Sequence, residues 1–143
     1  MIGVDTTFLV QLELVELPAH KAAHEILQRE ILQPHTPLAL APQVLSEFIH
    51  VATDPRRFQT PLTMDEAVAK AGFWWSAGEV QHVFPGSEST ILFLDWMKRH
   101  QLGRKRLLDT QLAAVLWTAG VRSLLTSNPA DFQIFGFRLL VPA

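Results

Sequence analysis

The sequence predicts a single α/β domain over residues 1–143, with a central, mainly parallel sheet flanked by helices. Short apolar runs such as Ile2–Val4 alternate along the chain with longer segments whose apolar residues recur at helical spacing. Single prolines and glycines separate these segments, and no repeat or polar linker marks a second domain. Strands that alternate with helices usually pair in parallel, because each helix carries the chain back across the sheet.

The expected elements follow from these patterns in chain order. The expected strands are Ile2–Val4, Pro37–Leu40, Glu79–Pro85, Ser123–Thr126 and Phe137–Pro142. Helices are expected from Thr6, from Pro18 in a first helical turn, after Pro42, and over Met64–Ala77, Glu88–Gln101 and Leu107–Ala119. Gly120 follows the last helix in the position of a glycine C-cap. Ligands of such sheets bind beyond the carboxyl ends of the strands.

Composition narrows the class of protein. The chain has no cysteine, which excludes disulfides, thiolate metal sites and a cysteine nucleophile. No apolar run approaches the roughly 18 residues of a membrane span, and the first residues lack the pattern of a signal peptide. We therefore expect a soluble, cytoplasmic protein that does not contact a membrane.

The charge distribution allows only local binding of nucleic acid. The net charge is −2, so the molecule as a whole does not attract RNA or DNA. Basic residues nevertheless cluster over 98–106, and Arg56 and Arg57 form a smaller pair. Each group is either a nucleic-acid contact or a solvated surface loop.

Three acidic residues occupy special positions, although each has an ordinary explanation. Asp5 ends the first strand, where an aspartate often caps the next helix. Asp109 stands near the start of an apolar helix, where it could also be a cap, and Glu47 lies on a polar helix stripe that could face water. Asn128 and Asp131 follow another strand at the same expected edge of the sheet. Together these residues predict a site that none of them predicts alone.

Carboxylates that lie close together repel one another unless a cation neutralises them. Oxygen ligands select a hard ion, Mg²⁺ or Mn²⁺, which can activate water for phosphodiester hydrolysis. Phosphate-binding glycine loops, serine-hydrolase elbows and zinc-protease motifs are absent from the sequence. His20 and His24, one helical turn apart, are interpreted as helix surface.

Four segments together resemble the PIN-domain family, and its VapC-type toxins in particular. They are IGVDTTFL at residues 2–9, SEF at 46–48, LLDTQLAAVLWTAGV at 107–121 and LLTSNPADF at 124–132. The resemblance covers nearly the whole chain. It implies a PIN-like three-layer fold and a ribonuclease that uses Mg²⁺ or Mn²⁺ at a site of three or four acidic residues.

The resemblance also implies roles for residues of this chain. Asp5, Glu47 and Asp109 correspond to the family's metal-binding acids, with Glu47 binding a second ion or positioning the attacking water. Thr7 corresponds to a small polar residue that holds the site or the phosphate. The fourth acidic position is open between Asn128 and Asp131, and a two-metal site is doubtful if neither side chain reaches the metal. Arg104, Lys105 and Arg106 are expected to meet RNA or a partner.

The implied partners are an RNA substrate, a cognate antitoxin protein and a second copy of the chain in a homodimer. Phe73, Trp74 and Trp75 either serve such an interface or lie partly in the core. The alternative function is a PIN-fold module that binds RNA or protein without cutting, which Asn128 and the negative net charge favour. A related DNase is a third possibility, but the chain is short for the helices that clamp DNA.

Overall fold

The structure, a computed structural model, describes residues 1–142 and contains a five-stranded, wholly parallel sheet. The strand order is β3-β2-β1-β4-β5, so the first strand is central. Gly3 of β1 lies opposite Ala39 of β2 on one side and Leu124 of β4 on the other. The strands are β1 (Ile2–Val4), β2 (Leu38–Leu40), β3 (Val80–His82), β4 (Ser123–Leu125) and β5 (Arg138–Leu140).

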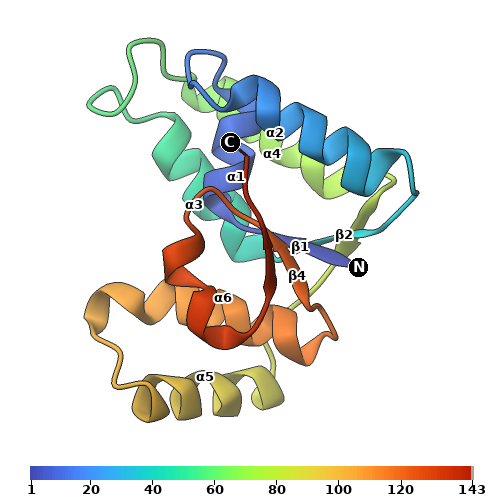
Figure 1. The fold of residues 1–143 in the computed structure, drawn as a ribbon. Coiled ribbons are helices and arrows are strands. Elements are labelled where there is room, and N and C mark those ends of the chain that lie inside the picture. Colours follow the sequence, from blue (N-terminus) through green and yellow to red (C-terminus); the bar gives the residue numbers. More distant parts are fainter. Residues whose placement is uncertain (143) are drawn as a thin grey trace.

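Helices cover both faces of the sheet. Figure 1 shows α1 to α4 on one side of the strands and α5 and α6 on the other, which confirms the predicted three-layer α/β architecture. The α-helices are α1 (Thr6–Glu13), α2 (His20–Leu27), α3 (Pro42–Ala52), α4 (Met64–Ser76), α5 (Ser87–Arg99) and α6 (Leu107–Thr118). Short helical turns are η1 (Gln28–Leu32), η2 (Arg104–Arg106), η3 (Pro129–Asp131) and η4 (Gln133–Phe135).

The second helix differs from its predicted form at both ends. It begins at His20, and Pro18 lies in the preceding turn rather than in the first helical turn. Beyond Leu27 the helix widens into a π-helical segment, η1, before the chain turns toward β2. The predicted glycine C-cap is present after α6, where Gly120 has φ +91°.

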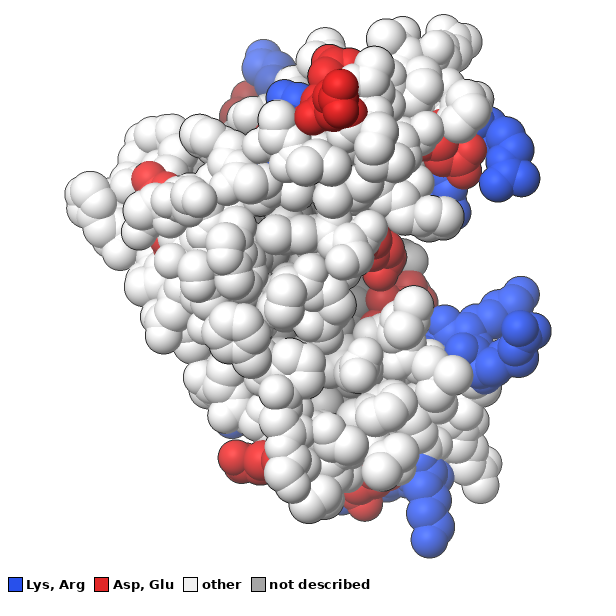
Figure 2. All heavy atoms as spheres, turned by 180° about the vertical axis from the view of Figure 1, so that it is seen from behind, with Lys and Arg blue, Asp and Glu red and all other residues white. Residues whose placement is uncertain are grey.

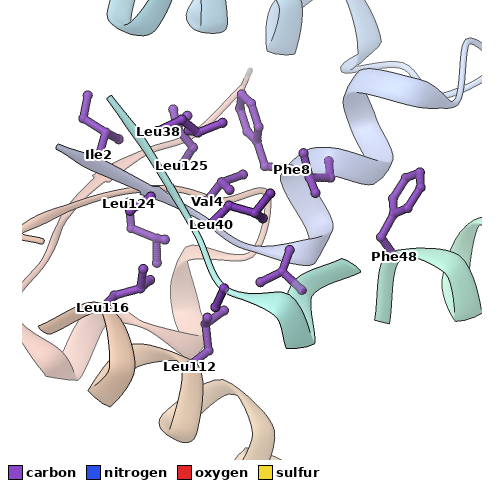
Figure 3. Close-up of a cluster of buried hydrophobic side chains, with 14 of the residues drawn as sticks. Ile2, Val4, Phe8, Leu38, Leu40, Phe48, Leu112, Leu116, Leu124 and Leu125 are labelled. Atoms are coloured by element: carbon purple, nitrogen blue, oxygen red, sulfur yellow. The ribbon is translucent and has the colours of Figure 1, made fainter. Parts of the chain in front are cut away.

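The core lies on both faces of the central strands. Figure 3 shows Leu112 and Leu116 of α6 on one side of the strands and Phe8 of α1 on the other. Phe8 is completely buried, and Leu112 and Leu116 are at least 95% buried. The neighbouring strands β1 and β2 are buried on both faces, which explains why they read as continuous apolar runs instead of alternating patterns, whereas the edge strands β3 and β5 are partly exposed.

Close packing of α6 on β1 depends on Gly3. A Cβ atom at position 3 would lie 3.0 Å from Leu116 Cδ1 and 3.2 Å from Val121 Cγ1. Leu116 follows Asp109 by two helical turns, so the same contact that seats α6 on the sheet also places Asp109 near the end of β1. The glycine therefore contributes to the geometry of the carboxyl edge.

The aromatic segment of α4 divides between core and surface. Trp74 is buried and its Nε1–H donates to Glu13 Oε1 at 3.0 Å, whereas Phe73 is largely exposed and Trp75 is partly buried. One of the three residues is thus core, and Phe73 remains available to an interface. Within residues 1–142, no helix has the length and apolar character needed to cross a membrane.

We expect Gly3→Ala to destabilise the protein by about 1–3 kcal/mol, because the added methyl group must displace Leu116 and Val121. Gly72→Ala is the matched control, since Gly72 lies within α4 and a Cβ there meets no atom within 4 Å. That control should stabilise the helix by about 0.5–1 kcal/mol. Urea unfolding measures both changes, and equal effects of the two substitutions would contradict the close approach.

Candidate active site

A pocket opens at the carboxyl edge of the sheet, between α1, α3 and α6. Its volume is about 360 Å³. Figure 2 shows a hollow on the right of the molecule, with acidic side chains inside it and Lys or Arg side chains projecting on either side. The lining residues are Asp5, Thr6, Thr7, Gln43, Val44, Ser46, Glu47, His50, Leu108, Asp109, Gln111 and Leu112. The structure therefore brings Asp5, Glu47 and Asp109 to one pocket.

Asp5 lies directly after β1, and only 3% of its surface is exposed. Its Oδ1 accepts a hydrogen bond from the Phe8 N–H at 3.0 Å, which caps α1. The hydroxyl of Thr7 donates to Oδ1 at 2.8 Å, and that of Thr126 donates to Oδ2 at 2.5 Å. Cap and site were alternatives in the sequence, but in the structure the carboxylate caps α1 and also lines the pocket.

Burial is the largest influence on the pKa of the Asp5 carboxyl group. Desolvation raises the pKa from 3.8 to about 6, although the hydrogen bonds from Thr126, Phe8 and Thr7 each lower it. The negative charge of Glu47 adds a smaller upward contribution. A buried carboxylate with three donors but no positive partner is thus one that a cation would stabilise.

Thr126 joins the ends of two neighbouring strands. It follows β4, is completely buried, and its Oγ1 accepts from the Asn128 N–H at 2.9 Å while bonding Asp5. The Ser127 N–H donates to Thr7 Oγ1 at 2.9 Å. These bonds fix the turn after β4 against the end of β1. The Thr7 hydroxyl, expected to hold the site or the phosphate, holds the site in this structure.

Glu47 lies on α3, which begins with Pro42 and presents its polar stripe to the pocket. The side chain is half-buried, and this burial raises its pKa. The positive charges of His50 and Arg57 oppose the shift. Glu47 is therefore a wall of the pocket and not an ordinary solvent-facing glutamate.

Asp109 lies in the first turn of α6 and is partly exposed. It is not the N-cap, because Arg106 occupies that position. Desolvation is the largest cause that raises its pKa to about 7, and the carboxylates of Asp131, Glu47 and Asp5 raise it further. The acidic side chains are consequently close enough to repel one another appreciably.

Asp131 lies beside Asp109, outside the lining of the pocket. Its carboxylate shares a hydrogen bond with Asp109 that favours a protonated Asp109 carboxyl group. Asn128 Nδ2 donates to Asp131 Oδ2 at 2.5 Å, so the amide lies behind Asp131. In this arrangement Asp131 is the residue of the turn after β4 that interacts with Asp109, and Asn128 contacts Asp131.

Of the three basic residues predicted to meet RNA or a partner, Arg106 bonds within the protein, whereas Arg104 and Lys105 are exposed. Arg106 is partly buried, donates to the Asp131 backbone oxygen at 2.5 Å, and pairs with the Asp131 carboxylate at 3.9 Å. It therefore holds the turn that carries Asp131. Arg104 and Lys105, in η2 just before α6, are exposed and available to a ligand.

Gln43 is a lining residue that the sequence did not single out. It lies one helical turn before Glu47, and both polar atoms of its side-chain amide are buried without a hydrogen-bond partner among residues 1–142. A buried amide without partners is unfavourable by about 1–3 kcal/mol unless water or a ligand bonds it. Glutamine on a polar helix stripe carries no signal in the sequence that would distinguish it from a surface residue.

The donor set at the pocket suits a hard divalent cation. All candidate ligands are oxygen atoms, and burial, with a smaller contribution from neighbouring carboxylates, raises the pKa of Asp5 and Asp109. Within residues 1–142, however, no three His, Cys, Asp or Glu side chains are grouped as a ready metal site. Such a geometry accommodates Mg²⁺, which keeps several waters and is often held by one or two carboxylates together with substrate phosphate.

The protein is a three-layer α/β protein with a wholly parallel sheet, and its acidic pocket lies at the carboxyl edge of that sheet. No protein-family model matches the sequence, and no curated protein is similar enough in sequence to count as a match. Solved structures do share the fold.

One similar structure is the sarcin-ricin loop cleaving toxin VapC20 of Mycobacterium tuberculosis, with a TM-score of 0.75, 21% identity and 96% of each chain covered. A toxin-antitoxin complex from Klebsiella pneumoniae has a TM-score of 0.67 and 14% identity, covering 100% of this chain and 98% of the other. VapBC-1 from nontypeable Haemophilus influenzae has a TM-score of 0.65 and 18% identity, with 99% and 98% covered. The predicted PIN-like fold of VapC toxins is confirmed.

Burial of Asp109, together with repulsion by its neighbouring carboxylates, predicts a dependence of stability on pH. The pKa of Asp109 is higher in the folded chain, about 7, than its ordinary value of 3.8. The folded state therefore binds this proton more tightly, and the resulting stabilisation, complete below about pH 4, is lost as pH rises to about 7. Asp109→Asn removes this loss, so in EDTA at pH 8 the variant should be more stable than wild type by about 1–2 kcal/mol.

Urea unfolding across this pH range tests the expectation. The advantage of Asp109→Asn should shrink as pH falls to 4 and below, where the wild-type carboxyl becomes protonated in the unfolded state as well. Asp65→Asn, at an exposed position of α4, is the matched control. Parallel pH profiles for wild type and Asp109→Asn would show that folding does not raise the pKa of Asp109.

Proposed function

We propose that this protein is a metal-dependent endoribonuclease that hydrolyses RNA phosphodiester bonds and acts as the toxin of a type II toxin-antitoxin pair. The main support is that Asp5, Glu47 and Asp109 line one pocket at the carboxyl edge of this fold. A solved toxin of the same fold is described as one that cleaves the sarcin-ricin loop. The fold alone would not carry the proposal, because one fold can host many activities.

The residues of the pocket have separate roles in the proposed reaction. Asp5 is the rigid ligand, because hydrogen bonds from Phe8, Thr7 and Thr126 fix both of its carboxylate oxygens. Glu47 is the more accessible carboxylate, and its raised pKa makes it a better acceptor for the proton of an attacking water. Water then adds to phosphorus as one P–O bond breaks, and the leaving oxygen takes a proton.

Asp5 and Asp109 would hold a Mg²⁺ or Mn²⁺ ion, and Asp131 would complete the acidic rim beside Asp109. Such an ion lowers the pKa of bound water and neutralises charge that develops on the phosphate. The hydrogen bond from Asn128 to Asp131 orients the Asp131 carboxylate beside Asp109. Because Asp5, Glu47 and Asp109 are the only acidic residues among those of 1–142 that line the pocket, a single tightly held ion is the simpler proposal.

Purified protein with Mg²⁺ or Mn²⁺ should cut RNA, and Asp5→Asn should lower the rate by more than about 100-fold, since even outer-shell partners of metal sites matter 10- to 100-fold. Cleavage of labelled RNA followed on gels measures the rate. Asp65→Asn, which removes an exposed acid on α4, should cleave normally. Robust cutting by Asp5→Asn, or by wild type in excess EDTA, would refute the mechanism.

The same assay separates the enzyme from the alternative of a non-catalytic module that binds RNA or protein. A module would bind RNA without cutting it, and Asp5→Asn would leave binding intact.

The antitoxin is tested by coexpression with the small reading frame expected next to this gene. Two of the similar structures are toxin-antitoxin complexes, which supports such a partner. A homodimer, also expected, is measured by analytical ultracentrifugation.

A further inference from the structure

The loop after α3, residues 53–61, is ordered by two carboxylates. Asp54 Oδ1 accepts from the Arg56 N–H at 2.9 Å, which forms a tight turn. Glu16, from the segment after α1, accepts from the N–H groups of Gln59 at 3.0 Å and Thr60 at 2.7 Å. Hydrogen bonds from a distant part of the chain therefore hold an exposed loop in one conformation.

This loop presents two guanidinium groups to solvent. The side chains of Arg56 and Arg57 are 91% and 62% exposed. Their Nε atoms lie 3.5 and 3.6 Å from the two oxygens of Asp54, so a single carboxylate serves two cations and a net positive charge remains. Exposed ion pairs of this kind contribute little to stability, about 0–1 kcal/mol. Fold stability alone does not account for the arrangement.

The loop continues directly from the wall of the acidic pocket. His50 lines the pocket and lies in the last turn of α3, three residues before the loop begins. In Figure 1 the loop (green) and the segment before α6 (yellow-orange) lie on the same side of the molecule, the loop beyond α3 and the segment beside α6. The helices α3 and α6 both line the pocket. The second segment carries the exposed Arg104 and Lys105.

The acidic pocket is therefore flanked by basic side chains on two sides, as Figure 2 shows. Such flanks are required of a site that binds RNA in a chain whose net charge is −2, because the pocket itself repels phosphate. Arginine is suited to this purpose, since its planar guanidinium binds phosphate with two parallel hydrogen bonds.

We propose that Arg56 and Arg57 bind backbone phosphates of RNA on the side of the scissile bond opposite to Arg104 and Lys105. This inference rests on the proposed ribonuclease function and narrows its substrate to an RNA strand that continues across the pocket in both directions. Asp54 is a positioning residue in this arrangement, since it orients both arginines without meeting the RNA.

The chain offers a closely matched control for the two arginines. Arg29 and Arg138 are 63% and 64% exposed and share one carboxylate, Glu30. Arg138 is the first residue of β5 and so lies at the amino edge of the sheet, away from the pocket. Arg29→Gln/Arg138→Gln and Arg56→Gln/Arg57→Gln therefore remove the same charge from equivalent surroundings.

Binding of a fluorescent single-stranded RNA in EDTA, measured over a range of salt concentrations, tests the inference without cleavage. If both arginines contact phosphates, Arg56→Gln/Arg57→Gln should bind about 10-fold more weakly at low salt and lower the slope of log K against log salt by about 1.4. The Arg29→Gln/Arg138→Gln slope should match that of wild type. Thermal melts establish that each variant is folded.

The outcomes separate this inference from the proposed function. If wild type cleaves RNA but the two double variants have equal salt slopes, the arginine inference is overturned and the nuclease stands. If wild type binds RNA but never cleaves it with Mg²⁺ or Mn²⁺, the nuclease proposal fails. If Arg56→Gln/Arg57→Gln loses antitoxin binding while its salt slope for RNA is unchanged, the loop contacts a protein, which also overturns the inference.

Discussion

The buried Asp5 carboxylate is the interaction on which the arrangement of the carboxyl edge depends. Asp5 follows the central strand, and its Oδ1 accepts a hydrogen bond from the Phe8 N–H at the start of α1. Its Oδ2 accepts a hydrogen bond from the Thr126 hydroxyl, which lies at the end of the neighbouring strand. A carboxylate buried in this way needs several donors to offset its lost hydration. The donors come from both ends of the chain, so folding of the sheet and assembly of the pocket are the same event.

Local signals account for most of the fold that could be predicted from the sequence. The strands β1 and β2 are short apolar runs buried on both faces, and helices such as α2 and α3 have clear apolar stripes, so both appear in patterns of neighbouring residues. The second helix was less predictable. Pro18 is compatible with a first helical turn but lies outside it, and the π-helical end at η1 depends on how the chain reaches β2.

The site was only partly accessible from the sequence. Taken singly, Asp5, Glu47 and Asp109 read as caps or surface residues. Their joint placement predicted a site, and the resemblance to a family was needed to give each residue a role. Thr126 was missed as a partner of Asp5 because that bond follows from the register of β1 against β4. The positions of Asn128 and Asp131 relative to Asp109 likewise depend on the turn after β4, which Arg106 holds from a distant segment.

The repulsion among the acids also determines how ligands of the pocket affect one another. Binding of any cation relieves this repulsion and is favourable for that reason, whether the cation is a metal ion or a guanidinium group of another protein. Two such cations cannot both relieve it, so they compete for the same carboxylates and each lowers the apparent affinity of the other. At a pocket shaped by Asp5 and Asp109, one cationic ligand can thus exclude another without any change in the fold.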